Sequence, residues 1–164
     1  MFGTSGIRGR VGEEVTCGLA LSVGRALAAE GYGTVVVGRD PRQSGEMLAD
    51  AVVAGLREGG SDVVRVGMAS TPTIARAVEW VDADAGVSVT ASHNPAPDNG
   101  LKLWTETGRA FDGAQQDAIA RRVREDDYAL VDAANVGAQR HLEEAIGRHA
   151  DALVDAVDAD LDGL

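Results

Sequence analysis

Apolar residues recur along this chain at two spacings, one typical of helices and the other typical of buried strands. Within the first 125 residues, helical spacing is found in four segments, at residues 13–30, 44–60, 71–80 and 112–125. Valine-rich runs without regular polar alternation predict strands between these helices, at 34–38, 62–67 and 86–91. The alternating order of strands and helices favours parallel strands joined by right-handed crossovers.

The residues at the ends of these segments fit the expected helix starts. Ser44, Thr71 and Asp112 have side-chain oxygens that can cap the three later helices. Pro72 suits a first helical position, and the acidic Glu13 suits the start of the first helix.

A fourth strand is predicted at 100–104. The loop that separates it from the strand at 86–91 is too short for a crossover helix, so these two strands should be antiparallel. The predicted fold class is α/β, a three-layer α/β/α domain with a mixed, mainly parallel four-stranded sheet.

We expect this domain to span residues 1–135. Residues 126–137 lack periodicity, which is typical of a linker. Helical spacing returns at 138–157, so residues 136–164 are expected to form a linker helix that leads to a second domain absent from this chain.

Composition narrows the class of protein. The length of 164 residues suits about one domain. The net charge of -11 disfavours nucleic acid and acidic membrane surfaces as partners. No apolar run approaches the roughly 20 residues of a membrane span, and the start "MFGTSGIRGR" lacks the apolar segment of a signal peptide, so a cytoplasmic protein is expected. Cys17 is the only cysteine, which excludes an internal disulfide.

Lys102 is the only lysine among 15 basic residues. Arginine in place of lysine in an acidic chain is typical of a halophilic organism, although a GC-rich genome also favours arginine. A single retained lysine can supply a compact charge for a phosphate or a titratable amine for proton transfer. The alternative is that Lys102 only protects an edge strand from unwanted pairing.

Ser92 lies in the stretch "TASHNPAPDNGLK", residues 90–102, between the third and fourth strands. Turn formation explains part of this stretch, since Asn99 and Gly100 can reverse the chain. However, Ser92 follows the end of a buried strand, where α/β proteins place many functional groups. The loop is also longer than a reversal requires, and its two prolines stiffen it. The loop is therefore predicted to hold Ser92 and His93 in position.

Two covalent roles suit a serine in this position. A hydrolase serine needs a base and an elbow motif, but the chain has no G-x-S-x-G, and the side chains of Ser92 and His93 would point apart in extended chain. A phosphate-carrying serine needs backbone donors and cations instead. The glycine-rich start "FGTSGIRG", residues 2–9, can approach an anion closely, and Arg8 can grip a phosphate with two hydrogen bonds. A flexible end with a surface arginine is the alternative for this segment.

Three motifs together resemble the first domain of the α-D-phosphohexomutase family: "FGTSGIRG" at 2–9, "GRDPRQSG" at 38–45 and "TASHNPAPDNGLK" at 90–102. The family interconverts hexose 6-phosphates and hexose 1-phosphates of glucosamine, mannose or glucose, and the first motif slightly favours the glucosamine type. The resemblance implies that Ser92 is a phosphoserine that donates its phosphoryl group to the sugar. The bisphosphorylated sugar then returns its other phosphate to Ser92.

The resemblance also implies roles for the residues around Ser92. Arg8 and Lys102 would be charge partners of the phosphate, with Lys102 also an acid/base group, and His93 would assist them. The remaining site residues would contact phosphate or shape the loop: Thr4, Ser5, Asn94, Pro95, Asn99 and Gly100.

The cofactors implied by the resemblance are Mg²⁺ and a hexose 1,6-bisphosphate activator. Ser92 would hold the metal through its phosphate, together with carboxylates of a "D-x-D-x-D-R" stretch that this chain lacks. The chain also lacks the sugar-reading "G-E-x-S-G-H" motif. Its expected partners are therefore hexose phosphates and domains II–IV of the same polypeptide, without which it should be inactive. The alternative is a stand-alone, non-catalytic module that binds sugar phosphates.

Overall fold

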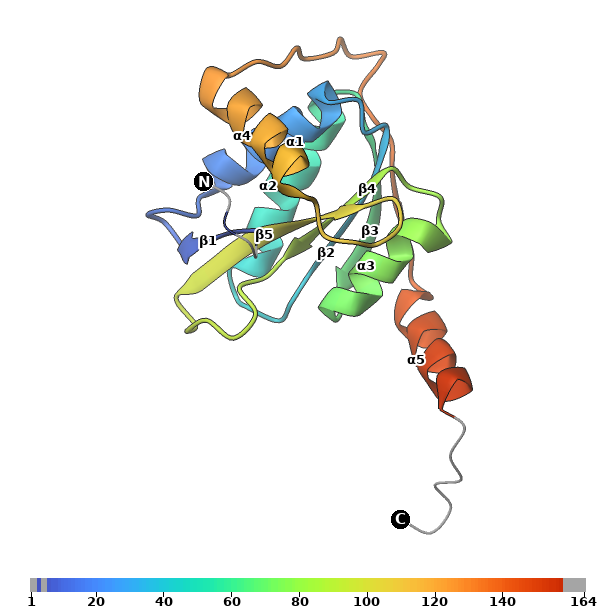
Figure 1. The fold of residues 1–164 in the computed structure, drawn as a ribbon. Helices are drawn as coiled ribbons and strands as arrows, with labels where there is room; N and C mark the ends of the chain where they lie inside the picture. Colours follow the sequence, from blue (N-terminus) through green and yellow to red (C-terminus); the bar gives the residue numbers. More distant parts are fainter. Residues whose placement is uncertain (1–2, 4–5, 158–164) are drawn as a thin grey trace.

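The computed structural model describes residue 3 and residues 6–157, which form one β-sheet between two layers of helices (Figure 1). The strands are β1 (Ile7–Arg10), β2 (Thr34–Arg39), β3 (Asp62–Met68), β4 (Ala85–Val89), β5 (Asp98–Thr105) and β6 (Gln139–His141). The helices are α1 (Cys17–Ala29), α2 (Gly45–Glu58), α3 (Thr71–Trp80), α4 (Gly113–Glu125) and α5 (Ala145–Ala156). The predicted three-layer α/β/α class is confirmed.

Over the described residues, the sheet has six strands in the order β1-β5-β4-β2-β3-β6, whereas the sequence predicted four. β2 pairs in parallel with β3 and β4, and β3 pairs in parallel with β6. β5 is antiparallel to β4, as predicted, and also to β1. The two missed strands are the edges of the sheet. β1 has the sequence IRGR, and all three residues of β6 are exposed, so neither strand carries an apolar pattern.

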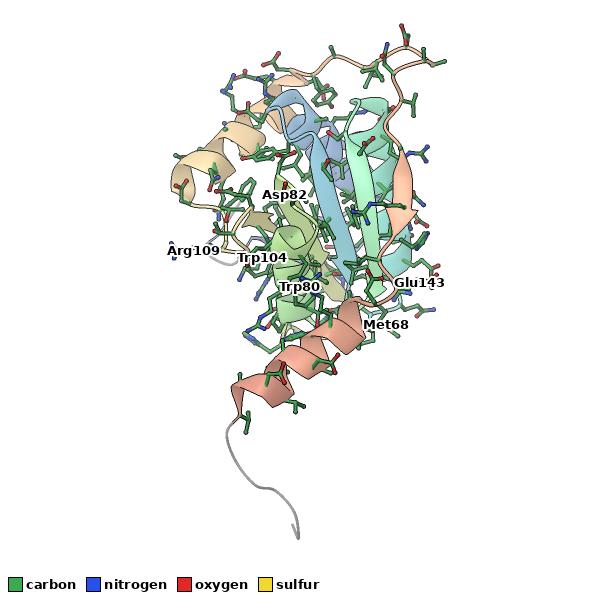
Figure 2. The ribbon with its side chains drawn as sticks, turned by 90° about the vertical axis from the view of Figure 1, so that its right-hand side faces the viewer. Met68, Trp80, Asp82, Trp104, Arg109 and Glu143 are labelled. Carbon is green, nitrogen blue, oxygen red and sulfur yellow. The ribbon has the colours of Figure 1, made fainter. Side chains whose placement is uncertain are left out.

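The two faces of the sheet are covered by different helices. α1, α2 and α4 pack on one face, where Val35 and Val37 of β2 join their apolar cluster. α3 lies on the other face, toward which Val36 and Trp104 point, and α5 packs against α3; Figure 2 shows α3 in front of the sheet and α5 below it. Burial of alternate valines on opposite faces explains why β2 shows no polar alternation.

The closest helix contact is between α1 and α2, where two glycines face each other. A Cβ at Gly55 would clash with the carbonyl oxygen of Leu21, and one at Gly24 would clash with that of Val52. The absence of side chains at these two positions lets the backbones of the helices approach each other directly.

Three of the expected helix starts need correction. α1 is capped by Thr16, which accepts from the Leu19 amide, so the helix begins at Cys17 rather than at Glu13. α3 is capped by Ser70 rather than by Thr71. Ser44 occupies the N-cap position of α2 but makes no side-chain capping bond. The Asp112 cap of α4 is confirmed as a complete capping box.

The chain after α4 is more closely attached to the domain than a free linker. Val131 and Gly137 donate backbone hydrogen bonds to the carbonyls of Glu58 and Arg57 at the end of α2. The helix expected at 138–157 begins later, at α5, because its first residues form β6. The division of the chain into domains at residue 135 stays a prediction.

The longest of these helices, α2, has 14 residues. Within residue 3 and the 6–157 range, no helix is both long and apolar enough to cross a membrane.

Candidate functional site

An open cleft of about 1010 Å³ lies at the carboxyl ends of the parallel strands β2, β3 and β4. Its lining includes Asp40 and Arg42 after β2, Ser70 after β3, and Ser92 and His93 after β4. The side chains that sequence reasoning placed in the long loop therefore reach the functional edge of the sheet.

Ser92 is exposed and has a left-handed backbone conformation, with φ of 57°. Only a few per cent of residues other than glycine adopt such a value, and it is sustained where surrounding contacts impose it. The Ser92 amide donates to Thr90 Oγ1 at 2.9 Å. The same conformation corrects the expectation that Ser92 and His93 point apart, because Ser92 Oγ lies 3.5 Å from His93 Nδ1, at the long limit of a hydrogen bond.

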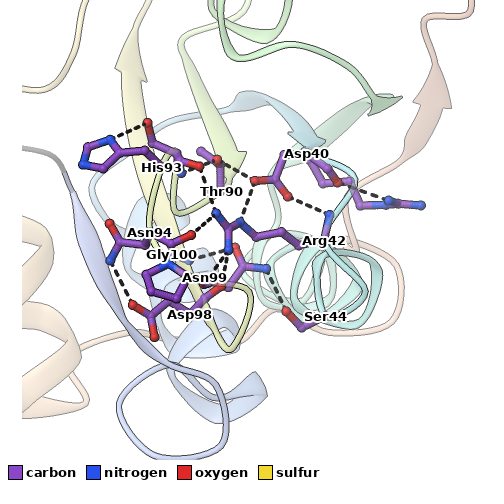
Figure 3. A network of polar contacts seen from close by, with 12 residues as sticks. Asp40, Arg42, Ser44, Thr90, His93, Asn94, Asp98, Asn99 and Gly100 are labelled. Atoms are coloured by element: carbon purple, nitrogen blue, oxygen red, sulfur yellow. Dashed lines mark hydrogen bonds and ion pairs between the residues drawn. The ribbon is translucent and has the colours of Figure 1, made fainter.

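Arg42 donates hydrogen bonds to the backbone of the loop that carries Ser92 (Figure 3). Its Nη1 donates to the carbonyl oxygens of Pro95 and Asp98, at 2.8 and 3.0 Å. Its Nη2 donates to those of Ser92 and Asn94, at 2.9 and 2.8 Å. One guanidinium therefore satisfies four loop carbonyls, which is the rigid support that the prolines alone were expected to give.

Asn94 and Asp98 tie the two ends of the loop together. Asn94 Nδ2 donates to Asp98 Oδ2 at 2.9 Å, and the Asp98 amide donates to the Pro95 carbonyl. Asn94 and Pro95 thus shape the loop in this structure, through a side chain and two backbone carbonyls.

Asn99 and Gly100 lie in β5, so the expectation that they form the reversing turn is wrong. Asn99 is buried, and its Nδ2 donates to Ser44 Oγ while its Oδ1 accepts from the Gly100 amide. A Cβ at Gly100 would clash with the Ile7 carbonyl oxygen, so glycine here permits close packing of β1 against β5. Both residues anchor the base of the loop.

Arg8 and Lys102 lie on one face of the sheet beside this base. Arg8 is paired with Gly100 across β1 and β5, and Lys102 is paired with Ser88 across β5 and β4. This register places the two cations diagonally adjacent on the α3 face. Arg8 Nε is buried and has no hydrogen-bond partner among the described residues.

Lys102 is not brought to Ser92. Its Nζ lies over the Trp104 ring, 4.5 Å from the centroid, which is the direction along β5 away from the loop. No hydrogen bond or ion pair joins Lys102 to Ser92, both of which are in the described part of the chain. Thr4 and Ser5 lie outside the described residues.

Metal ligands are scarce around Ser92. Among residue 3 and residues 6–157, no three histidines, cysteines or carboxylates gather in a way that could hold a metal ion. The carboxylate in the cleft, Asp40, accepts bonds from the Arg42 amide, Arg42 Nε and the Thr90 hydroxyl. The described residues therefore offer Ser92 as a metal contact but no complete site.

Sequence reasoning missed three residues that organise this loop: Asp40, Arg42 and Thr90. The signal lay in "GRDPRQSG", residues 38–45, which begins at the end of β2. β2 pairs in parallel with β4, the strand that leads to Ser92. The carboxyl ends of neighbouring parallel strands lie together, so an Asp and an Arg there are well placed to support the Ser92 loop.

The fold and the cleft define an α/β/α domain that presents an exposed serine on a rigid loop at the functional edge of its sheet. A model of the family described as phosphoglucomutase/phosphomannomutase, alpha/beta/alpha domain I, matches residues 1–130, and the chain belongs to this family.

Similar proteins span bacteria and archaea. A "Probable phosphoglucosamine mutase" of Methanobrevibacter smithii is 46% identical over 96% of this chain and 36% of its own length. The phosphoglucosamine mutase of Saccharopolyspora erythraea is 45% identical over 100% of this chain and 38% of its own length. A solved structure of a phosphoglucomutase/phosphomannomutase family protein from Burkholderia thailandensis has a TM-score of 0.81 and 32% identity, covering 95% of this chain and 35% of that one.

The chain thus spans little more than a third of the length of these relatives. The predicted family is confirmed, whereas the halophilic archaeal origin stays a prediction.

Proposed function

We propose that this chain is the phosphoserine domain of a phosphohexomutase that interconverts hexose 6-phosphate and hexose 1-phosphate. The observation that carries the proposal is Ser92, which is exposed at the end of β4 and held in a left-handed conformation by a rigid loop. The two phosphoglucosamine mutases among the similar proteins favour glucosamine phosphate as the substrate.

The reaction consists of two phosphoryl transfers, the first from Ser92 to the sugar and the second from the sugar back to Ser92. The bond from phosphorus to Ser92 Oγ breaks while a hydroxyl oxygen of the hexose phosphate forms the new bond to phosphorus. The hydroxyl proton passes to a base, and the Ser92 oxygen takes up a proton. In the return step the other phosphate of the bisphosphorylated sugar moves to Ser92, and the sugar oxygen regains a proton.

The cations beside the loop suit the charge of such a phosphate. The buried Arg8 Nε, which has no hydrogen-bond partner among residue 3 and residues 6–157, is a donor that an anion can satisfy, since buried polar groups are usually hydrogen-bonded. Lys102 is the proposed acid/base group, and its flexible side chain would have to leave Trp104 and turn toward the cleft. His93 Nδ1 lies 3.5 Å from Ser92 Oγ and is proposed to assist proton movement.

Mg²⁺ is proposed as a cofactor, held in part by the phosphate on Ser92. The other ligands would come from the part of the longer relatives that this chain does not cover. The bound ion would offset the negative charge of the phosphoryl group, and a hexose 1,6-bisphosphate would supply the first phosphate to Ser92.

The test is peptide mapping of the protein, expressed from its complete reading frame, after incubation with glucosamine 1,6-bisphosphate. Phosphate is expected on Ser92 and on no other residue, and the Ser92→Ala variant should lose mutase activity. Full activity of Ser92→Ala, or phosphate on a different residue, would overturn the proposal.

A non-catalytic module that binds sugar phosphates is the second candidate function. It is favoured by the incomplete metal site among the described residues and by the Lys102 ammonium, which lies over the Trp104 ring. Both candidates bind glucosamine 6-phosphate, so calorimetry measures only this binding, which should weaken in Arg8→Gln. Peptide mapping separates the candidates, because a module never places phosphate on Ser92.

A further inference from the structure

We propose that Asp40, Arg42 and Thr90 act as one positioning unit that imposes the left-handed conformation on Ser92, and so aims its hydroxyl into the cleft. This inference rests on the proposed function for its catalytic consequence, but its structural part stands on hydrogen bonds alone.

The unit reaches both backbone polar groups of Ser92. On the amide side, the Ser92 N–H donates to Thr90 Oγ1 at 2.9 Å, and the Thr90 hydroxyl donates to Asp40 Oδ2 at 2.7 Å. On the carbonyl side, the Ser92 oxygen accepts from Arg42 Nη2 at 2.9 Å. The route from the amide therefore ends on Asp40 and the route from the carbonyl ends on Arg42, and these two residues form an ion pair.

The Asp40–Arg42 pair is itself closed and shielded. Arg42 Nε lies 3.1 Å from Asp40 Oδ2, and the Arg42 amide donates to Asp40 Oδ1 at 3.0 Å. The side chains are only 14% and 17% exposed, so solvent screens this pair weakly. The two routes and the ion pair complete a ring of hydrogen bonds that runs through Ser92 (Figure 3).

The ring explains how a serine keeps a backbone conformation that is costly outside glycine. The residue before it, Ala91, is fully buried, and Asn94 donates its amide to the Ala91 carbonyl, so the chain enters the ring from a fixed position. With the amide and carbonyl of Ser92 both fixed, the direction of its Cα–Cβ bond is fixed as well. Small misplacements of a reacting oxygen lower transfer rates strongly, so this geometry should affect the chemical step more than sugar binding.

Thr90 is the residue at which the unit is best tested. Thr90→Val keeps the shape but removes the hydroxyl, and Thr90→Ser restores it. Thr107→Val, at an exposed threonine in the turn after β5, is the matched control. The first readout is hydrogen exchange at the Ser92 amide, resolved by mass spectrometry of the protein from its complete reading frame. Thr90→Val should raise the exchange rate about tenfold, and Thr90→Ser and the control should remain near the wild-type rate.

The second readout is steady-state mutase kinetics on the same proteins. Thr90→Val should lower kcat about tenfold or more with little change in KM, and Thr90→Ser should recover most of the loss. If the three residues act as one unit, adding Asp40→Asn to Thr90→Val should lower kcat little further.

The outcomes separate the inference from the proposed function. An unchanged Ser92 exchange rate in Thr90→Val, or fully additive effects in the double variant, would overturn the positioning unit. If the wild-type protein shows no mutase activity, the proposed function fails, while the exchange rates still decide whether the unit exists.

Discussion

The two faces of the sheet differ in what their strands present to the helices. Toward α1 and α2, the central strands β2 and β4 present valines that are fully or almost fully buried, at positions 35, 37, 87 and 89. Toward α3, the register places polar residues among the apolar ones: Arg8, Ser88, Thr90 and Lys102. One face is a packed core, and the other combines a smaller core with the groups that lead into the cleft.

This difference shows how the domain separates stability from chemistry. On the apolar side, α1 and α2 approach each other to backbone contact, as at Gly55. On the α3 side, each buried polar group also needs a partner, such as the Ser88 hydroxyl that accepts from Trp104 Nε1 at 2.8 Å. Changes on the first face should therefore affect stability, and changes near Ser92 should affect function more.

Gly55→Ala should give the largest loss of stability. The new methyl group would meet the Leu21 carbonyl, and such overpacking costs about 1–3 kcal/mol, more than the roughly 1 kcal/mol that alanine gains in a helix. Gly147→Ala is the matched control, because this helical glycine has open space around it and the change should stabilise the protein. Urea unfolding followed by circular dichroism measures both free energies, and equal values would remove the claimed difference in packing.

Ser88→Ala should cost less, about 1–2 kcal/mol, because it leaves the buried Trp104 N–H without its acceptor. Trp104 fluorescence reports on the local environment and urea unfolding on the free energy. Ser22→Ala, which removes a longer 3.4 Å contact with Tyr128, should change stability by less than about 0.5 kcal/mol. A Ser88→Ala protein as stable as wild type would show that this polar pair does not constrain the α3 face.

Ser92→Gly should be more stable than Ser92→Ala by about 1 kcal/mol. Glycine adopts a positive φ without the Cβ penalty, whereas alanine retains it, and both variants lack the hydroxyl. The comparison isolates backbone strain at the site from loss of the nucleophile. Equal unfolding midpoints would mean that Ser92 is not strained.

Tyr32 should give the smallest effect, seen only at alkaline pH. Burial against Phe111, with ring centroids 5.4 Å apart, raises the pKa of Tyr32 above its usual 10.0, because the charged form is poorly solvated there. The folded state then holds the proton more tightly than the unfolded chain. Its contribution to stability is complete below pH of about 10 and is lost as the pH rises through the folded pKa. As the pH rises from about 8 to about 11, the unfolding midpoint should fall less steeply for Tyr32→Phe than for the wild-type protein. The same slope in both proteins would contradict this account.

The central fold was predictable because its elements carry apolar patterns. The buried valines of β2 and the spacing of α2 are visible in the sequence, and so is the Asp112 capping box. β1 and β6 were not, because β1 buries only one large apolar side chain, Ile7, and β6 buries none, so neither strand shows an apolar pattern although they hydrogen-bond to β5 and β3. Such edge strands depend on the sheet already being formed.

The position of the Ser92 loop was predictable from the sequence, but its geometry was not. The loop motif pointed to Ser92. The approach of His93 Nδ1 to Ser92 Oγ, however, depends on the positive φ of Ser92, which the residue types of the loop do not predict. The support from Arg42 comes from 50 residues away, from the connection between β2 and α2, so loop composition alone could not indicate it. The contact of Lys102 with Trp104 is made between residues two apart on one face of β5, and it depends on the conformation of a flexible side chain.

The most direct test of the account is a single-turnover transfer from the phosphorylated protein, expressed from its complete reading frame. Ser92 is loaded with labelled phosphate, the excess donor is removed, and glucosamine 6-phosphate is added with Mg²⁺. The account predicts that label leaves Ser92 and that the same total amount of label appears in sugar bisphosphate and sugar monophosphate together. Label that stays on Ser92, or leaves it only as inorganic phosphate, would contradict the claim that this loop carries the transferred group.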